Sequence, residues 1–126
     1  LRADQADGTL ADLCDTLGID LLTLFGSAVT EPGRAADVDL GYGRFRDRAP
    51  TDHMDVVNAF GSRYGDTLDV MDLDAAGSVA RFAALHGIEV LVELTPGRYA
   101  NAQMAAFKSF CDTQRLRDRV LDVLAG

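Results

Sequence analysis

Two strand-like segments joined by a short loop place the strongest constraint on the fold of this chain. The apolar run Ile-Asp-Leu-Leu-Thr-Leu-Phe at 19–25 predicts a buried strand. The alternating segment Asp-Val-Asp-Leu-Gly-Tyr at 37–42 predicts a second strand. The loop between them contains Pro32 and Gly33 and is too short for a full crossover helix. A mixed sheet flanked by helices, in an α+β domain, is therefore favoured over a doubly wound parallel sheet.

Hydrophobic periodicity predicts the remaining elements. Helical spacing is expected at 8–17, from residue 51 or 52 to 64, at 75–86 and at 99–124, and further strands are expected at 67–73 and 88–94. In the helix at 75–86, Val79 is expected to point inward. No internal repeat or Pro/Gly/Ser linker divides the 126 residues, so a single domain spanning 1–126 is expected.

The charge balance limits the possible partners. Twelve Lys and Arg residues against twenty Asp and Glu residues give a net charge of 12 − 20 = −8. An acidic chain repels a phosphate backbone, so tight binding to nucleic acid is not expected. The same acidity suits cations or a basic protein partner.

Nothing in the sequence predicts a membrane protein or a secreted one. No apolar run approaches the roughly 18–20 residues of a membrane span, and the first residues lack the apolar region of a signal peptide. Cys14 and Cys111 fall in apolar-periodic stretches, which indicates buried thiols. A reducing, cytoplasmic compartment is the corresponding expectation.

A pair of carboxylates on the second predicted strand is the first candidate for chemistry. Asp37 and Asp39 are two residues apart, so in a strand they point to the same face. Carboxylates directed at one point repel each other unless a cation lies between them, and Mg²⁺ prefers oxygen ligands. The competing interpretation is that both aspartates form the polar face of a half-exposed strand.

Two further features lie near this pair in the sequence. Gly26 and Ser27 directly follow the apolar strand, where a glycine lets the backbone approach a phosphate and a serine offers an N–H and a hydroxyl. Asp69 interrupts an alternating apolar strand, and burying a lone carboxylate is costly unless it is paired or bound to metal. Asp72 competes for the same role, but Asp69 is preferred. Three carboxylates beside a phosphate loop fit two-metal phosphoryl transfer.

These motifs resemble a known superfamily. The stretch LFGSAVTEPGRAADVDLGYG at 24–43 is similar to the Gly-Ser…Asp-x-Asp signature of the nucleotidyltransferases. The stretch at 67–93 resembles the second half of the minimal nucleotidyltransferase (MNT) domains, in which the third aspartate opens a strand. The similarity runs from about Leu21 to the last helix. It implies the nucleotidyltransferase (DNA polymerase beta-like) fold.

The resemblance implies an activity and a role for each residue. The family transfers a nucleoside monophosphate from an NTP, here ATP or another NTP, to an acceptor with the help of Mg²⁺. Gly26 and Ser27 would hold the triphosphate, Asp37 and Asp39 would bind metal, and Asp69 would bind metal and act as the base. Small members that resemble this chain are often antitoxins encoded beside a HEPN-type ribonuclease toxin, and some silence the toxin by adding AMP to it.

The sequence also departs from the family pattern. Val29, Thr30 and Glu31 stand where an Ala-Arg-Gly segment is common, Ala36 replaces a frequent serine, and Arg34 offers an alternative positive charge. A degenerate antitoxin that neutralises its partner by binding alone is therefore one alternative. A second alternative is a small-molecule nucleotidyltransferase that modifies antibiotics as a homodimer, and the sequence leaves the oligomeric state open.

Other charged and apolar groups carry weaker signals. Arg44, Arg46 and Arg48 either grip a nucleotide or partner or form a solvated loop, and the second interpretation is favoured. His53 is expected to be an exposed residue in the first turn of a helix. The stripe of Met104, Phe107 and Cys111 is expected to belong to the core.

Overall fold

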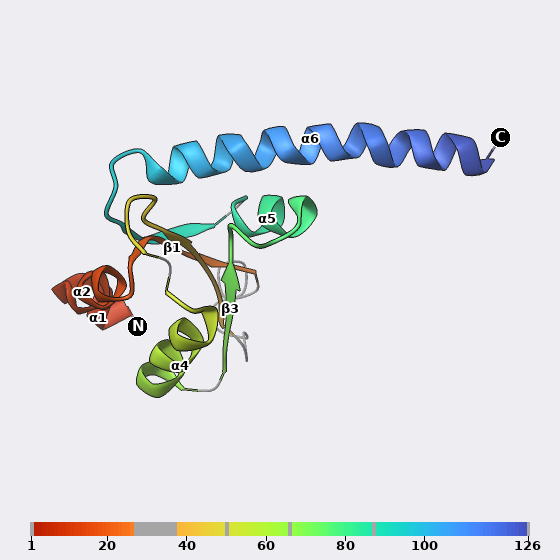
Figure 1. Cartoon of the computed structure of the whole chain (residues 1–126). Coiled ribbons are helices and arrows are strands. Elements are labelled where there is room, and N and C mark those ends of the chain that lie inside the picture. Colours follow the sequence, from red (N-terminus) through yellow and green to blue (C-terminus); the bar gives the residue numbers. More distant parts are fainter. Residues whose placement is uncertain (1, 27–37, 50, 66, 87, 126) are drawn as a thin grey trace.

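The computed structural model describes residues 2–26, 38–49, 51–65, 67–86 and 88–125. Within these residues the chain forms helices and strands in the following order: α1 (Arg2–Asp7), α2 (Thr9–Thr16), β1 (Ile19–Phe25), β2 (Val38–Arg44), α4 (His53–Tyr64), β3 (Leu68–Asp72), α5 (Ser78–Ala84), β4 (Glu89–Glu93) and α6 (Arg98–Ala125). Figure 1 shows these elements in sequence colours.

The four strands form one mixed sheet in the order β3-β2-β1-β4. β1 pairs antiparallel with both β2 and β4, while β2 pairs parallel with β3. The predicted mixed sheet of an α+β domain is thus confirmed. Because β2 and β3 run in the same direction, they begin at the same end of the sheet, where β1 ends.

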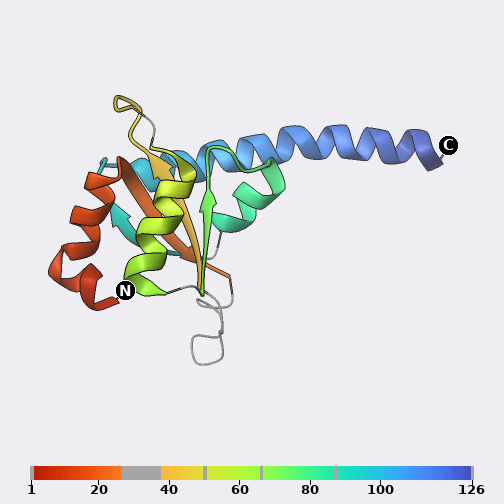
Figure 2. The ribbon, with the colours of Figure 1, turned by 60° about the horizontal axis from the view of Figure 1, so that its bottom comes forward.

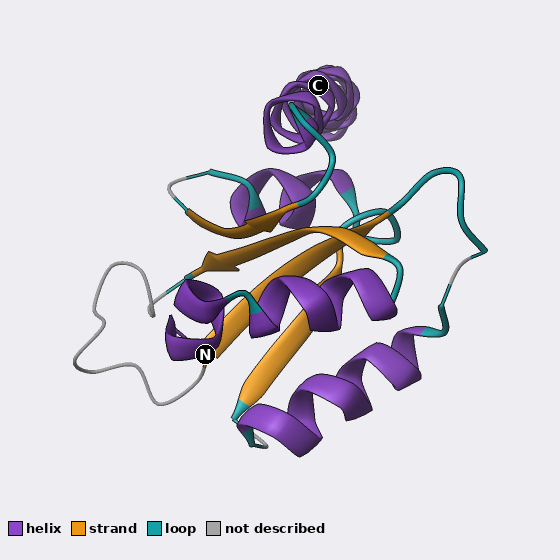
Figure 3. Cartoon of the chain, turned by 90° about the vertical axis from the view of Figure 1, so that its left-hand side faces the viewer, coloured by secondary structure: helices purple, strands orange, loops and turns teal. Residues whose placement is uncertain are grey.

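Helices cover both faces of the sheet, as Figure 3 shows. One core cluster lies on the side of α2 and α4, and it includes Leu22, Leu40 and Phe60. The second cluster lies on the side of α5 and α6, and it includes Leu21 and Leu73. Neighbouring residues such as Leu21 and Leu22 enter different clusters because successive side chains of a strand point to opposite faces.

Local hydrogen bonds set the helix ends. Asp52 caps α4, since its Oδ1 accepts a hydrogen bond from the Met54 N–H at 3.1 Å. α5 begins at Ser78, three residues later than predicted. The reason is the Asp72 carboxylate, which accepts hydrogen bonds from the N–H groups of Asp74 and Ala75 and holds them in a turn. Val79 is exposed and not inward-facing as expected.

The long helix α6 corrects one prediction. Met104 and Phe107 are exposed and do not belong to the core, because only one side of α6 rests on the sheet and α5. The contact with α5 runs through Phe110, whose ring stacks on that of Phe82 with centroids 4.3 Å apart. Figure 2, a view turned from that of Figure 1, also shows α6 continuing past α5. No helix in the described part of the chain is long and apolar enough to span a membrane.

The cysteines behave differently from each other. Cys14 is fully buried in the core cluster beneath α2, as predicted. Burial raises the pKa of its thiol to about 12. Cys111 is only partly buried on α6. Both are free thiols, so neither contributes a disulfide to the fold.

Candidate functional site

Two of the predicted site carboxylates lie side by side at one end of the sheet. Asp39 of β2 and Asp69 of β3 are direct partners in the parallel register. The Val38 N–H donates a hydrogen bond to the Thr67 carbonyl at 3.0 Å, which aligns the beginnings of the two strands. Partners in a ladder point to the same face, and neighbouring strands lie about 4.8 Å apart. Both carboxylates therefore face the side of α5 and α6.

Gly26 lies directly beside this carboxylate pair. Phe25, the last residue of β1, is the antiparallel partner of Asp39, and Gly26 follows with φ of 75°. A Cβ at Gly26 would overlap Oδ2 of Asp39. Position 26 thus requires glycine for two reasons: its positive φ, and the Asp39 carboxylate that occupies the space of a side chain.

The other two predicted site residues, Ser27 and Asp37, lie outside the described residues. Their place relative to Gly26 and Asp39 therefore remains a prediction from the sequence. Within the described ranges no group of three or more His, Cys, Asp or Glu side chains is placed to hold a metal ion. The described part of the site is a pair of carboxylates, of which Asp39 is partly buried and Asp69 is exposed.

Asp72, the competitor of Asp69, lies at the opposite end of β3. Its Oδ2 accepts from Arg44 Nη1 at 2.5 Å, and both side chains are largely shielded from solvent. Arg44 also donates to the Thr51 carbonyl and to the Tyr42 hydroxyl. Asp72 is therefore committed to an ion pair that ties β3 to β2, which supports Asp69 as the site residue.

His53 belongs to the same hydrogen-bonded network. Its Nδ1 lies 2.6 Å from the hydroxyl of Tyr42, and the two rings stack with centroids 5.8 Å apart. Burial, and then the negative charge of Asp72, raise the pKa of the Tyr42 hydroxyl. His53 is thus partly buried and bonded, in contrast to the exposed residue expected from its position.

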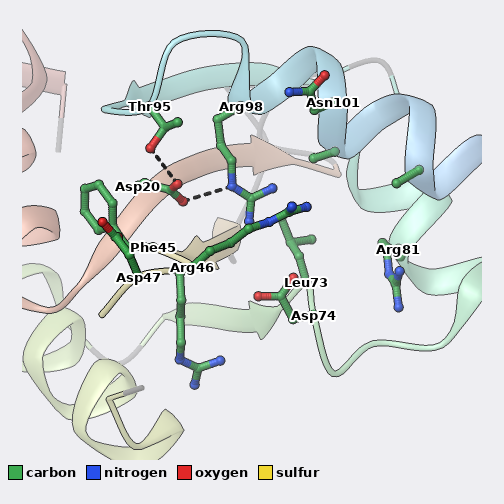
Figure 4. A pocket seen from close by; sticks show the side chains of 13 residues that line it. Asp20, Phe45, Arg46, Asp47, Leu73, Asp74, Arg81, Thr95, Arg98 and Asn101 are labelled. Carbon is green, nitrogen blue, oxygen red and sulfur yellow. Dashed lines mark hydrogen bonds and ion pairs between the residues drawn. The ribbon is translucent and has the colours of Figure 1, made fainter. Parts of the chain in front are cut away.

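A cavity of about 750 Å³ lies at the far end of the sheet from Asp39 and Asp69. Figure 4 shows Arg98 at its centre, joined to Asp20. Arg98 Nε donates to Asp20 Oδ1 at 3.0 Å, and Thr95 donates to Oδ2 at 2.8 Å. Sequence reasoning missed this pair, although an aspartate inside the apolar run at 19–25 was a signal, because a buried carboxylate needs a partner.

The three arginines of the β2–α4 region have different roles. Arg44 is held by Asp72, and Arg48 pairs with Asp15 at 2.7 Å while it stacks on Phe45. Arg46 is exposed and lines the cavity. The expectation of a solvated loop therefore holds for Arg46 and, in part, for Arg48.

Comparisons with solved structures identify the fold. A structure of a toxin–antitoxin with AMP-PNP contains a chain with a TM-score of 0.73 at 17% identity, over 95% of this chain and 98% of that one. The MntA–HepT toxin–antitoxin structure matches with a TM-score of 0.71 at 15% identity, over 100% of both chains. A structure of tri-AMPylated Shewanella oneidensis HEPN toxin in complex with MNT antitoxin matches with a TM-score of 0.71 at 16% identity, over 99% of this chain and 98% of that one.

Sequence comparison by itself gives no such assignment. No model of a known protein family matches the sequence, and no curated protein matches it significantly. At identities of 15–17%, these matches establish a shared fold but do not establish that this chain has the activity of the matched proteins. Together with the mixed four-stranded sheet, the structural matches show that the chain shares the fold of the chains matched in these toxin–antitoxin structures.

Proposed function

We propose that this chain is a Mg²⁺-dependent nucleotidyltransferase that transfers AMP from ATP to a HEPN-type partner protein and thereby acts as an antitoxin. The observation that carries the proposal is the direct pairing of Asp39 with Asp69 beside Gly26. Two carboxylates and a backbone turn without a side chain lie at one end of the sheet. These groups are part of the set that nucleotidyl transfer needs, which Asp37 and Ser27 would complete.

The carboxylate pair fits Mg²⁺ by its donor chemistry. Asp39 and Asp69 present oxygen ligands on one face, and Mg²⁺ in nucleotide sites usually uses one or two protein carboxylates together with phosphate oxygens. Asp37 would add a third carboxylate. When bound, the metal would offset charge on the triphosphate and polarise the α-phosphate.

Residues of this chain would also bind the triphosphate and accept the proton of the acceptor hydroxyl. The backbone at Gly26, with Ser27, would hold the triphosphate, because the missing side chain allows a close approach. The acceptor hydroxyl oxygen would form a bond to the α-phosphorus while the bond from that phosphorus to the pyrophosphate oxygen breaks. The hydroxyl proton would pass to the carboxylate of Asp69, which is exposed and therefore accessible to an acceptor.

A protein acceptor is supported by the neighbours in fold. One of them is a complex of an MNT antitoxin with a HEPN toxin that carries AMP groups, and another contains AMP-PNP, an analogue of ATP. The negative charge of −8 on this chain also suits a basic partner.

Helix α6 offers a surface for that partner. The side of α6 that packs on the domain through Ala106 and bonds to α5 through Thr113 continues as Leu116, Val120 and Leu124. These three side chains are 63%, 51% and 78% exposed, and Figure 1 shows this part of α6 beyond both α5 and the sheet. A row of exposed apolar residues on a helix is typical of a surface that another protein covers.

The test is a transfer reaction with defined variants. The chain is incubated with ATP, Mg²⁺ and the product of the neighbouring gene, and the partner is weighed by mass spectrometry. We expect a gain of one or more AMP groups, and we expect Asp39→Asn and Asp69→Asn to abolish it. Asp55→Asn, an exposed aspartate on α4, is the matched control and retains transfer.

Two results would overturn the proposal. No mass gain with any NTP would remove the enzymatic assignment. Neutralisation of the partner in cells that survives Asp39→Asn would show that binding alone suffices, as in the degenerate antitoxin. Transfer that is lost with Asp72→Asn and retained with Asp69→Asn would reverse the choice between these two aspartates.

A further inference from the structure

The cavity at the far end of the sheet contains guanidinium groups with unused hydrogen-bond donors. Arg98 is largely shielded from solvent, with a side chain that is 14% exposed. Its Nε bonds to Asp20, and the guanidinium makes no other hydrogen bond to the described residues. Gly43 gives it room, since a Cβ there would overlap Nη2 of Arg98. The two terminal amino groups therefore keep their N–H donors for a ligand.

Two more arginines from separate elements line the same cavity. Arg81 of α5 donates from Nη2 to the Ala76 carbonyl at 3.0 Å, but its Nε is buried and has no acceptor within the described ranges. Arg46, after β2, is exposed and has no hydrogen-bond or ion-pair partner in the described part of the chain. Three arginines from the β2–α4 loop, α5 and α6 thus line one cavity, with Arg98 at its centre and Arg81 at its side (Figure 4).

The acidic residues of the lining do not neutralise these groups one by one. Four arginines and three aspartates line the cavity, and Arg44 is already paired with Asp72, so the lining together with Asp72 carries a local charge of 4 − 4 = 0 on a chain of net charge −8. Both carboxylate oxygens of Asp20 are already bonded. Asp47 and Asp74 are exposed at the rim, where solvent screens their attraction.

The terminal amino groups of Arg98 and the guanidinium of Arg46 have N–H donors that make no hydrogen bond to the described residues, and an oxyanion in the cavity would supply acceptors for them. Guanidinium groups bind phosphate and carboxylate oxygens in a two-pronged geometry. A phosphate group has three strong acceptor oxygens and can meet guanidinium groups from several directions, whereas a carboxylate has two oxygens in one plane. The volume of about 750 Å³ lies within the range of sites for small molecules.

We propose that this cavity is a second ligand site, distinct from the one at Asp39 and Asp69, which binds the phosphate group of a small phosphorylated molecule through Arg98, Arg81 and Arg46. The site is independent of the proposed nucleotidyl transfer, since it lies at the other end of the sheet.

The test measures binding of inorganic phosphate without Mg²⁺ by calorimetry and by ¹H–¹⁵N NMR. We expect saturable binding with shift changes at Gly43, Arg81 and Asn101, and none at Gly26 or Asp69.

Arg46→Gln and Arg81→Gln should weaken phosphate binding about tenfold each, because each removes a charge-assisted hydrogen bond. Arg98→Lys keeps the positive charge beside Asp20 but loses the bidentate hydrogen-bonding geometry of the guanidinium. It should weaken phosphate binding at least as much. Arg48→Gln, outside the cavity, is the control.

Several outcomes would overturn the proposal. Absence of saturable binding at millimolar phosphate would do so, as would shift changes confined to Gly26, Asp39 and Asp69. Tighter binding of succinate than of phosphate would assign the site to carboxylates instead. Equal loss of affinity in Arg48→Gln and Arg46→Gln would mean that the anion responds to overall charge and not to the cavity. Because Arg46 makes no bond to the described residues, Arg46→Gln tests the site without endangering the fold.

Discussion

The carboxylate of Asp39 occupies the space in which a side chain at Gly26 would stand. The two residues meet because β1 ends where β2 begins, with Phe25 and Asp39 as antiparallel partners. Any side chain at position 26 must displace the Asp39 carboxylate from its place beside Asp69.

Gly26→Ala is therefore expected to impair transfer more than it impairs folding. The positive φ of 75° costs about 1–2 kcal/mol for a residue with a Cβ. Displacement of the Asp39 carboxylate should in addition lower the rate of nucleotide transfer about a hundredfold, since misplacement of a catalytic group by about 1 Å can have that effect. Transfer rate and melting temperature are measured on the same preparation.

Gly97→Ala is the matched control for this substitution. Gly97 has nearly the same φ, 77°, but its nearest neighbour is the side chain of Asn101 at 3.9 Å, which is an ordinary contact. The control should lose similar stability and retain transfer. If both variants lost transfer equally, backbone strain and not the Asp39 carboxylate would explain the effect.

Asp20→Ala is expected to be among the most destabilising substitutions of a charged residue. Asp20 is 3% exposed and accepts hydrogen bonds from both Arg98 and Thr95, which fasten the beginning of α6 to β1. Removing one partner of a buried ion pair costs about 3–5 kcal/mol, because the other charge stays buried. Denaturant unfolding measures the loss.

Asp15→Ala provides the comparison for Asp20. Asp15 also pairs with an arginine, Arg48, but both side chains are about half exposed. Exposed pairs of this kind contribute about 0–1 kcal/mol. Equal losses for the two variants would contradict the role assigned to burial.

Cys14 is expected to resist alkylation in the folded state. Burial raises the pKa of its thiol to about 12, so almost no thiolate forms at neutral pH, and the side chain is inaccessible. Iodoacetamide should modify Cys14 only after unfolding, whereas the partly buried Cys111 should react in the native protein. Peptide mapping after labelling measures both.

The same raised pKa predicts how stability responds to alkali. The folded protein holds the Cys14 proton more tightly than the unfolded chain, whose thiol has a pKa near 9.0. The contribution of this protonated thiol to the free energy of unfolding is complete below pH 9. It is lost as the pH rises from 9 towards 12. Cys14→Ser, which has no thiol to ionise there, should show a shallower decline. Identical pH profiles would contradict the assignment.

The exposed stripe of α6 predicts a variant that separates partner binding from folding. The double substitution of Leu116→Glu and Val120→Glu should change the free energy of unfolding by less than about 0.5 kcal/mol, since both side chains are exposed. It should weaken the complex with the partner about tenfold or more. Asp118→Lys lies on the opposite side of the helix and should leave affinity unchanged. Retained affinity in the double variant would place the interface elsewhere.

The sequence by itself determined the class of fold and the order of the elements from α2 onwards, whereas α1 was not predicted. Period-two and helical patterns predicted the strands and most helices, and the short connection after Phe25 argued against a crossover helix and for the mixed sheet that the structure contains. The alternation that predicted the strand at 67–73 is also present in the structure, where Val70 enters one core cluster and Met71 packs against the other. These features depend on local backbone geometry, which a sequence encodes directly.

Tertiary structure decided which groups meet. Asp69 and Asp72 look alike in sequence, and only the parallel register of β2 and β3 puts Asp69 beside Asp39 and Asp72 beside Arg44. The burial of α6 residues likewise depends on where α5 lies beneath the helix, so Met104 and Phe107 have the spacing of core residues and yet are exposed. Contacts between distant segments arise from packing of the whole chain, and periodicity along one segment contains no information about its neighbour.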